Sequence, residues 1–213
     1  MKVVLADDHR MMRDGLRAVL EKAGVQVLGE AANGNEAVAE AKRLRPDVVV
    51  MDVGMPELNG IEATKRPTVE LPGTKVLALS MTADRRYVSA MLEAGAAGYL
   101  LKNAASEELL SALASLTRGE TYLSPAITKA MAAPAIRRRT PTGALSRPLS
   151  AREREVLQLV AEGKSSKEIA ALLHIALPTV ETDRRQLMEK LNLRTIAELT
   201  KYAIREGLTS SEV

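Results

Sequence analysis

The segment that decides the fold is VVVMDVGMPELNG, which runs from Val48 to Gly60. Its first part is an apolar run as long as a β-strand, and Asp52 stands near the end of that run. A strand with no polar alternation is typical of a parallel sheet that is covered on both faces. The Gly and Pro residues that follow indicate a loop. The segment therefore predicts a buried parallel strand that carries one carboxylate to the edge of a sheet.

Apolar runs and helical patterns alternate on both sides of this strand. The other predicted strands lie at residues 3–6, 25–29, 75–80 and 98–101, and the predicted helices at 10–23, 34–45, 59–66, 84–94 and 106–118. Five strand–helix units in series predict an α/β fold, a doubly wound five-stranded parallel sheet, over residues 1–120. Pro67 falls where the third helix would continue, so we expect that helix to end or kink near Lys65.

The rest of the sequence predicts a linker followed by a helical domain. Residues 124–133 predict a short helix, and the Pro- and Arg-rich stretch from Pro134 to Pro148 completes a linker over 121–147. Beyond it, helical patterns fill residues 148–213, at about 151–162, 166–173, 177–191 and 196–206. Two of these helices begin with capping boxes, Ser150 with Glu153 and Thr195 with Glu198. Four helices in this spacing predict an all-α helix-turn-helix domain.

The composition excludes several kinds of site. The chain has 213 residues, which suits two small domains. It has no cysteine, which excludes disulfides, thiolate zinc sites and a cysteine nucleophile, and no Phe or Trp, which argues against an aromatic platform for stacking bases. No apolar run reaches the ~20 residues that span a membrane, and the N-terminus shows no signal-peptide pattern. We therefore expect a cytoplasmic protein without membrane contact.

The charge is divided unevenly between the two predicted domains. Residues 1–123 contain 15 basic and 17 acidic side chains, a net charge of −2, whereas residues 124–213 contain 15 and 10, a net charge of +5. The basic excess is therefore C-terminal, where a polyanion is expected to dock.

Polar residues stand at the carboxyl ends of four predicted strands. They are Asp7 and Asp8 after the first, Asp52 at the third, Ser80 at the fourth and Lys102 after the fifth. Open α/β sheets bind ligands at this edge. Converging carboxylates repel one another unless a cation joins them, and oxygen ligands suit Mg²⁺. A carboxylate beside Mg²⁺ can act as a nucleophile toward a phosphoryl group, whose oxygens Lys102 and Ser80 would bind.

Taken one at a time, these residues have ordinary structural explanations. Asp7 and Asp8 could cap the helix that follows, Asp52 could be another cap, and Lys102 could be a solvated surface lysine. Their joint placement at neighbouring strand ends is what favours a functional site.

Residues 1–120 resemble the receiver domain of two-component response regulators, a flavodoxin-like fold. The motifs that carry the resemblance are LADDH (5–9), MDVGMP (51–56), NGIEA (59–63), LS (79–80) and GAAGYLLK (95–102). The resemblance implies that Asp52 accepts a phosphoryl group from a sensor histidine kinase. It also implies that Asp7, Asp8, Asp52 and the main-chain carbonyl of Gly54 bind Mg²⁺. Ser80 would be the switch hydroxyl, and Tyr99 the aromatic residue that responds to phosphorylation.

Residues 148–208 resemble the LuxR-type helix-turn-helix domain, through LSAREREVL (149–157), KEIA (167–170), TVET (179–182), LMEKL (187–191) and AEL (197–199). A receiver joined to this domain is the arrangement of the NarL/FixJ class, so we expect a transcription regulator that binds double-stranded DNA, as a homodimer. The helix at 177–191 would enter the major groove, and the start of the preceding helix is a candidate phosphate site. The candidate DNA-binding residues are Lys164, Ser165, Lys167, Thr179, Glu181, Thr182, Arg184, Arg185 and Lys190.

The recognition helix departs from the family pattern. His174 and Ala176 replace a usual glycine and a usual hydroxyl cap, Pro178 stands where lysine is common, and Asp183 replaces the usual histidine. A lost hydroxyl cap costs about 1 kcal/mol. We therefore expect altered base specificity and modest DNA affinity, and we expect His174 to be a turn residue.

Three rival functions remain on the sequence alone. An aspartyl-phosphate phosphohydrolase would usually carry a second Asp at the position of Gly54, and no cap domain is present, so we expect no enzymatic turnover. A ligand-sensing LuxR-type regulator would need an aromatic-lined pocket, and the N-terminal half has no Phe or Trp. The third rival is a regulator that acts through protein contacts, with DNA binding weakened by Pro178 and Asp183. RNA polymerase is a further candidate partner.

Overall fold

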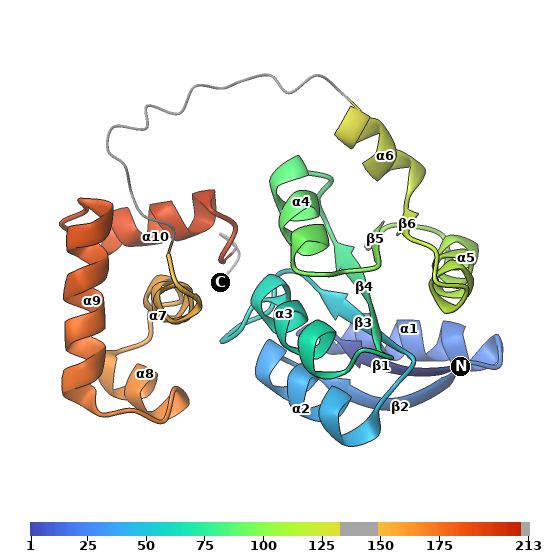
Figure 1. The fold of residues 1–213 in the computed structure, drawn as a ribbon, viewed down its shortest axis with the longest axis horizontal. Coiled ribbons are helices and arrows are strands. Elements are labelled where there is room, and N and C mark those ends of the chain that lie inside the picture. Colours follow the sequence, from blue (N-terminus) through green and yellow to red (C-terminus); the bar gives the residue numbers. More distant parts are fainter. Residues whose placement is uncertain (133–148, 210–213) are drawn as a thin grey trace. The chain divides into compact units, whose positions relative to one another are not determined.

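The computed structural model describes residues 1–132 and 149–209, and of residues 67–70 only the backbone (Figure 1). The chain forms two compact units, Met1–Ala133 and Pro134–Val213. Most of the predicted linker lies outside the described residues. Residues 122–132, predicted as its beginning, form a short strand and a helix that pack on the first unit.

The first unit is built on a six-stranded parallel sheet in the order β2-β1-β3-β4-β5-β6. Its strands are β1 (Lys2–Ala6), β2 (Gln26–Ala31), β3 (Val48–Asp52), β4 (Lys75–Ser80), β5 (Gly98–Leu101) and β6 (Tyr122–Leu123). All five residues of β3 are buried, as its unbroken apolar sequence predicts. The predicted doubly wound α/β class is confirmed.

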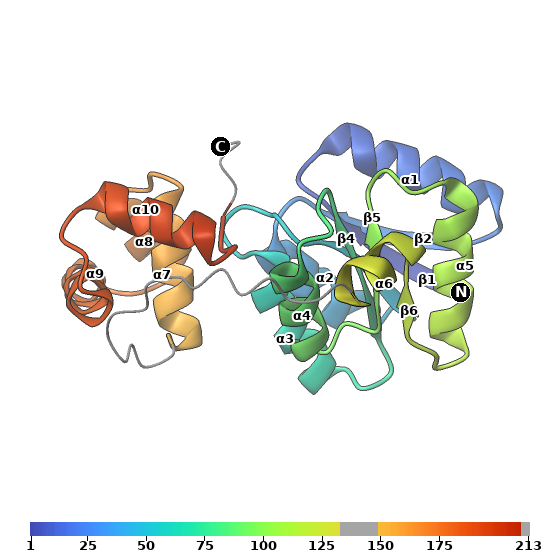
Figure 2. The ribbon, with the colours of Figure 1, turned by 90° about the horizontal axis from the view of Figure 1, so that it is seen from above.

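Helices cover both faces of this sheet, and Figure 2 shows α1 and α5 on one side and α2, α3 and α4 on the other. The helices are α1 (Arg10–Lys22), α2 (Gly34–Leu44), α3 (Gly60–Glu70), α4 (Arg85–Glu93), α5 (Ser106–Thr117) and α6 (Pro125–Ala132). Two apolar cores result. One joins α1 and α5 to the sheet through residues such as Leu20 and Leu113. The other lies under α2, α3, α4 and α6 and includes Met51 and Tyr99.

The predicted number of strands was wrong by one. β6 extends the sheet beyond β5, where the main-chain N–H of Tyr122 donates to the carbonyl of Ala97 at 3.1 Å and that of Ser124 to the carbonyl of Tyr99 at 3.2 Å. A strand of two residues has too little sequence to show periodicity. The buried side chain of Ile127, on α6, then packs into the same core as Tyr99.

Of the two outcomes expected for the third helix, an end near Lys65 was wrong, because α3 continues through Pro67 to Glu70, and a kink there stays a prediction. Proline removes the backbone hydrogen bond to the carbonyl four residues earlier, that of Ala63. However, α3 packs against α2, α4 and β4. Tertiary packing of this kind contributes more to helix stability than local propensity does, so the helix survives the lost bond.

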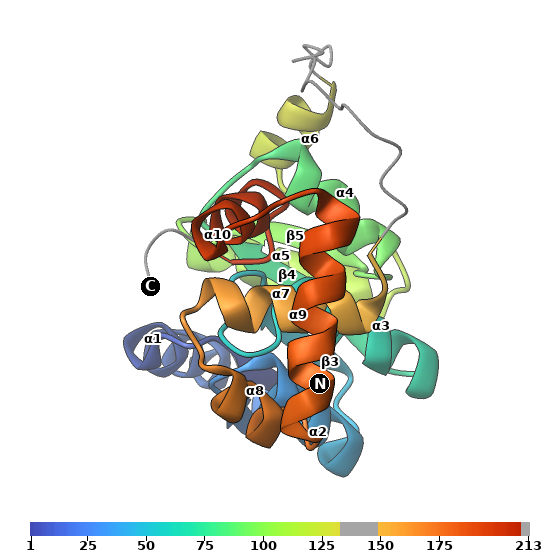
Figure 3. The ribbon, with the colours of Figure 1, turned by 90° about the vertical axis from the view of Figure 1, so that its left-hand side faces the viewer.

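The second unit contains, within residues 149–209, the helices α7 (Ala151–Ala161), α8 (Ser166–Leu172), α9 (Leu177–Leu191) and α10 (Ile196–Arg205). α7 packs against the other three, and α8 lies at the N-terminal end of α9 (Figure 3). Their core contains Val156, Val180, Leu187 and Leu199, among other aliphatic side chains. Both predicted capping boxes are present, at Ser150 and at Thr195.

Within residues 1–132 and 149–209, none of the helices combines the length and the apolar character needed to cross a bilayer.

Two glycines at α1 should respond oppositely to alanine. Gly15 lies in the middle of α1, on its exposed face, and Gly24 follows the helix with φ +77°. A Cβ at either position would have no atom within 4 Å. Gly15→Ala should raise the free energy of unfolding of the first unit by about 0.5–1 kcal/mol, because glycine weakens a helix interior. Gly24→Ala should lower it by about 1–2 kcal/mol, because a left-handed backbone strains an L residue. Denaturant unfolding measures both, and the same sign for both would contradict this account.

Candidate functional site

The carboxyl ends of β1, β3, β4 and β5 are neighbours in the sheet and carry the predicted polar residues. Asp7 and Asp8 follow β1, Asp52 ends β3, Ser80 ends β4 and Lys102 follows β5. Connections run to opposite sides of the sheet from β1 and from β3, which makes this the switch point where open α/β sheets bind ligands. The structure therefore brings together all five side chains that the sequence placed there.

The acidic side chains form a compact cluster. Ligand atoms of Asp7, Asp8, His9 and Asp52 all lie within 4.8 Å of one another. Asp7 and Asp52 are buried, whereas Asp8 and His9 are exposed. His9 was not predicted as a site residue. Its Nδ1 lies 2.8 Å from Asp8 Oδ1, and its main-chain N–H donates to Asp7 Oδ1 at 2.9 Å.

Lys102 joins the two buried carboxylates. Its Nζ lies 2.7 Å from Asp52 Oδ2 and 2.7 Å from Asp7 Oδ2, and its side chain is 5% exposed. Its main-chain N–H donates to the carbonyl of Ser80 at 2.8 Å, which fixes the start of the loop after β5. The interpretation of Lys102 as a solvated surface lysine is therefore wrong.

The pKa values of this cluster reflect competing effects. Burial raises the pKa of Asp52, and the neighbouring Asp7 raises it further, while Lys102 acts in the opposite direction. For Lys102, burial acts to lower the pKa, but the two aspartates outweigh it and the net shift is upward. Lys102 is thus held as a cation between two carboxylates, which limits their mutual repulsion.

Tyr99 and Ser80 meet near the start of the connection between β4 and α4. Tyr99 is completely buried, and its hydroxyl donates to the main-chain carbonyl of Thr82 at 3.1 Å. Burial raises the pKa of Tyr99 to about 12, although a hydrogen bond with Ser80 acts against it. The Ser80 hydroxyl oxygen also accepts from the N–H of Thr82 at 3.2 Å. The loop after β4 is therefore tied to both predicted switch residues.

The donors at this edge fit a small divalent cation. The carboxylates of Asp7, Asp8 and Asp52 offer hard oxygen ligands, and Asp8 and the neighbouring His9 are open to solvent, which leaves room for the water ligands that Mg²⁺ retains. Gly54 is exposed, and its N–H donates to Asp52 Oδ1 at 3.2 Å, so the Gly54 backbone lies beside the cluster. Asp7, Asp8, Asp52 and the Gly54 carbonyl are thus the candidate magnesium ligands.

Some of the predicted DNA-binding side chains on α9 are exposed, and others make hydrogen bonds within the second unit. Thr179, Glu181 and Arg185 are exposed. The Thr182 hydroxyl donates to the carbonyl of Pro178 at 2.9 Å, within the helix. Arg184 Nη1 donates to Ser166 Oγ at 2.5 Å, on α8.

Lys190 is held by α7. Its Nζ donates to both carboxylate oxygens of Glu153, at 2.7 and 2.9 Å. Glu153 is also the third helical residue of α7 and pairs with Ser150 in its capping box. Although burial acts to raise the pKa of Glu153, Lys190 and Ser150 outweigh it and lower the pKa. Lys190 therefore fastens the C-terminal end of α9 to the start of α7.

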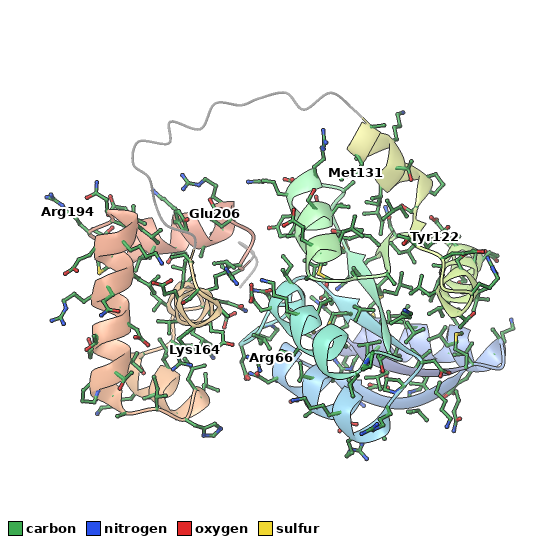
Figure 4. The ribbon with its side chains drawn as sticks, viewed as in Figure 1. Arg66, Tyr122, Met131, Lys164, Arg194 and Glu206 are labelled. Carbon is green, nitrogen blue, oxygen red and sulfur yellow. The ribbon has the colours of Figure 1, made fainter. Side chains whose placement is uncertain are left out.

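A third capping box was missed at the start of α8. The Ser165 hydroxyl oxygen accepts from the N–H of Glu168, and Glu168 Oε2 accepts from the N–H of Ser165 at 2.8 Å. The Glu168 carboxylate and the Ser165 hydroxyl therefore each accept from one N–H group at the helix start that was predicted as a phosphate site. The spacing of Ser and Glu by three residues is the signal that could have found it. Lys164 lies on the turn between α7 and α8 (Figure 4), and Lys167 is exposed on α8.

The residues around α9 that differ from the family pattern fit the local structure. His174 has φ 52°, the left-handed conformation that usually requires glycine, so it is the predicted turn residue. Ala176 provides no side-chain cap, and Pro178 lies in the first turn, where proline is tolerated. Asp183 Oδ2 lies 3.7 Å from Arg152 Nε, so an arginine of α7 offsets part of its negative charge.

A groove of about 530 Å³ runs along the exposed side of α9 and the turn after it. Three arginines and two glutamates give it mixed charge. Its lining residues are Glu181, Arg184, Arg185, Met188, Glu189, Asn192, Leu193 and Arg194.

Two known domain families match the chain. Residues 3–114 match the response regulator receiver domain, and residues 147–203 match the bacterial regulatory proteins of the luxR family. The two matches fall on the two compact units.

Curated relatives match over nearly the full length. The chain is 38% identical to the oxygen regulatory protein NreC of Staphylococcus carnosus, over 98% of this chain and 99% of that protein. It is 39% identical to the transcriptional regulatory protein MctR of Rhizobium johnstonii, over 99% of this chain and 96% of that protein. Among solved structures, the complex of the two-component response regulator RcsB with DNA matches with a TM-score of 0.58 and 28% identity, covering 95% of this chain and 96% of RcsB.

Proposed function

The chain belongs to the two-component response regulators that join a receiver domain to a LuxR-type DNA-binding domain, and we propose that phosphorylation of Asp52 switches it. The observation that carries the proposal is the buried Lys102, which lies 2.7 Å from both Asp52 and Asp7 at the edge where four strands end. We propose a receiver over 1–120, a linker over 121–147 whose residues 122–132 pack on the first unit, and a DNA-binding domain over 148–213.

The chemistry follows from the placement of these groups. An Asp52 carboxylate oxygen attacks the phosphorus of a phosphohistidine on the sensor kinase, the P–N bond breaks, and the imidazole nitrogen takes up a proton. Lys102 stays beside the new phosphoryl group as a fixed cation, and Ser80 donates its hydroxyl hydrogen to a phosphoryl oxygen. Mg²⁺, held by Asp7, Asp8, Asp52 and the carbonyl of Gly54, supplies charge neutralisation when bound.

Phosphorylation would act on the output domain through the loop after β4. Moving the Ser80 hydroxyl toward a phosphoryl group breaks its bond with the N–H of Thr82, whose carbonyl accepts from Tyr99. A ligand shifts an equilibrium only by binding one state better than the other. Tyr99 is buried and its hydroxyl donates to the Thr82 carbonyl, so we propose that the switch acts through this hydrogen bond and the residues around Tyr99.

DNA is the proposed target of the second unit. The basic excess of residues 124–213, the LuxR match and the relation to RcsB, which has been solved bound to DNA, support this target. We propose binding as a homodimer on paired half-sites. A protein that binds bacterial chromosomal DNA works in the cytoplasm, and no turnover of small molecules is expected from this site.

The function is tested on the full chain with its own promoter region. Treatment with acetyl phosphate and Mg²⁺ should produce a phosphoaspartate, and the treated protein should shift the promoter fragment at lower concentration and elute as a dimer. DNA binding that is strong and unaffected by phosphorylation would contradict the proposed switch. Absence of any shift in either state would favour the regulator that acts through protein contacts.

Arg185 should contribute to DNA affinity without reading the sequence. Its side chain is exposed on α9 and makes no hydrogen bond or ion pair within residues 1–132 and 149–209, whereas the side chains of Arg184 and Lys190 bond to α8 and α7. Arg185→Ala should weaken binding about five-fold and reduce the slope of log affinity against log salt by about 1, because one fewer phosphate is neutralised. Lys201→Ala, an exposed lysine of α10, is the matched control. Equal losses for both variants would contradict the placement of DNA on α9.

A further inference from the structure

Arg13, on α1, makes two directional contacts next to the acidic cluster. Its Nη1 donates to the main-chain carbonyl of Asp7 at 2.6 Å, and its Nε donates to Glu30 Oε2 at 3.0 Å. The Arg13 side chain is 13% exposed, so solvent does little to loosen these contacts. A planar guanidinium can hold two acceptors at a fixed angle, which an ammonium cannot do.

Glu30 is the anchor for this arginine and lies near the end of β2. It is shared with Arg17, whose Nε donates to Glu30 Oε1 at 2.7 Å. Burial acts to raise the pKa of Glu30, but the hydrogen bonds from Arg17 and Arg13 outweigh it and lower the pKa. The carboxylate is thus kept ionised between two arginines, of which only Arg13 has a contact with Asp7 in the described part of the chain.

The Asp7 carbonyl belongs to the peptide that links Asp7 to Asp8. The N–H of Asp7 donates to the carbonyl of Ala31 at 3.1 Å, so β2 fixes the peptide before Asp7 and Arg13 fixes the peptide after it. Because a peptide is planar, fixing its carbonyl fixes the direction in which the next residue leaves. Asp7 points to Lys102 and Asp8 points to His9, and this peptide sets the angle between them.

We propose that Arg13 is a positioning residue that holds the Asp7–Asp8 peptide in the orientation that aims both carboxylates at one divalent cation. The proposal rests on the proposed function, because it concerns the same magnesium site. Arg13 itself touches neither the cation nor the phosphoryl group.

The charge of Arg13 and its positioning contact predict opposite effects on the affinity for a divalent cation when Arg13 is replaced. A cation near a metal site repels the metal, so removal of its charge alone would strengthen divalent binding. Loss of the positioning contact would weaken it, typically by about 10-fold or more for outer partners of metal ligands. The direction of the change therefore separates the two explanations.

The test measures Mn²⁺ binding to the full, unphosphorylated chain by the electron paramagnetic resonance signal of free Mn²⁺. Arg13→Lys keeps the charge and loses the planar guanidinium, so it should weaken Mn²⁺ binding about 10-fold. Arg13→Gln loses both and should weaken Mn²⁺ binding less than Arg13→Lys does, because removal of the positive charge partly offsets the lost contact. Arg17→Lys and Arg17→Gln are the matched controls, because they disturb the same Glu30 without touching Asp7, and they should bind Mn²⁺ as the wild type does. Phosphorylation of Arg13→Lys by acetyl phosphate should return to the wild-type rate at saturating Mg²⁺.

Two further measurements complete the test. Thermal unfolding of the metal-free variants shows whether each is folded, and Glu30→Gln, which leaves Arg13 in place with a weaker anchor, should give a smaller loss of Mn²⁺ affinity. Unchanged or stronger binding in both Arg13 variants, or equal losses at Arg13 and Arg17, would overturn the proposal. Wild-type protein that binds no Mn²⁺ and accepts no phosphoryl group would instead overturn the proposed function.

Discussion

Asp52→Asn should reduce labelling of the full chain by acetyl phosphate by more than about 100-fold, because it removes the nucleophile itself. The substitution is nearly isosteric, and Lys102 keeps its contact with Asp7, so the fold of the first unit should persist. Labelling is measured by intact mass in the presence of Mg²⁺, with hydroxylamine treatment to identify an acyl phosphate.

The control for this variant is an aspartate at the other end of the same strand. Asp47 directly precedes β3, at the opposite end from Asp52, and its Oδ2 accepts from the N–H of Lys2 at 2.6 Å. Asp47→Asn should label as the wild type does. If Asp52→Asn is labelled at the wild-type level, Asp52 is not the phosphoacceptor. If the phosphoryl group maps to Asp8, the phosphoacceptor is that other aspartate of the same cluster.

Gly60→Ala should destabilise the first unit more than any other glycine substitution described above. A Cβ at Gly60 would lie 2.0 Å from the main-chain oxygen of Asp52 and 3.0 Å from Val53 Cα. The N–H of Gly60 donates to the carbonyl of Val53 at 3.0 Å, and the Asn59 side chain caps α3 through the N–H of Glu62. The start of α3 is thus fastened against the end of β3, and an added methyl group forces them apart.

The expected loss is about 3 kcal/mol or more, at the upper end of what overpacking costs. For a unit of this size that corresponds to a fall in melting temperature of about 10 °C. Because the displaced backbone is that of Asp52, phosphorylation should also slow at temperatures where the variant is folded.

Gly73→Ala is the comparison for this variant. Gly73 lies in the turn before β4, and a Cβ there would have nothing within 4 Å. Its melting temperature should stay within about 3 °C of the wild-type value, as for a surface change of under 0.5–1 kcal/mol. A Gly60→Ala variant as stable as Gly73→Ala would mean that α3 is free to shift away from β3.

The strands, most helix bounds and the receiver cluster could be predicted because each depends on a local pattern. The run before Asp52 has the length and apolar content of a buried strand, and the ends of parallel strands necessarily share one edge of the sheet. By contrast, the path of α3 through Pro67 depends on packing against α2 and β4, which no local window contains. β6 depends on main-chain bonds to β5, formed by two residues whose side chains give no period.

The contacts that Arg184 and Lys190 of α9 make with other helices could not be predicted, for a related reason. The sequence places Lys190 on an exposed position of an amphipathic helix, but its partner, Glu153, is 37 residues away on α7. Arg13 was also missed, because its role depends on a carbonyl oxygen, and every residue of the chain has one. Long-range pairs of side chains, and contacts of side chains with the main chain, become visible only when the elements are assembled.

Because the protein has few aromatic rings, the tyrosine signals of its two units can be told apart by spectroscopy. With no Phe or Trp, the chain has four tyrosines, three in the first unit and Tyr202 in the second. Tyr202 lies on α10 with the Arg205 guanidinium carbon 4.9 Å from its ring centre. Selective labelling of tyrosine rings therefore gives one nuclear magnetic resonance signal for the helical half and three for the other, Tyr99 among them. Events in each half can be followed in the intact protein, without cutting the chain between them.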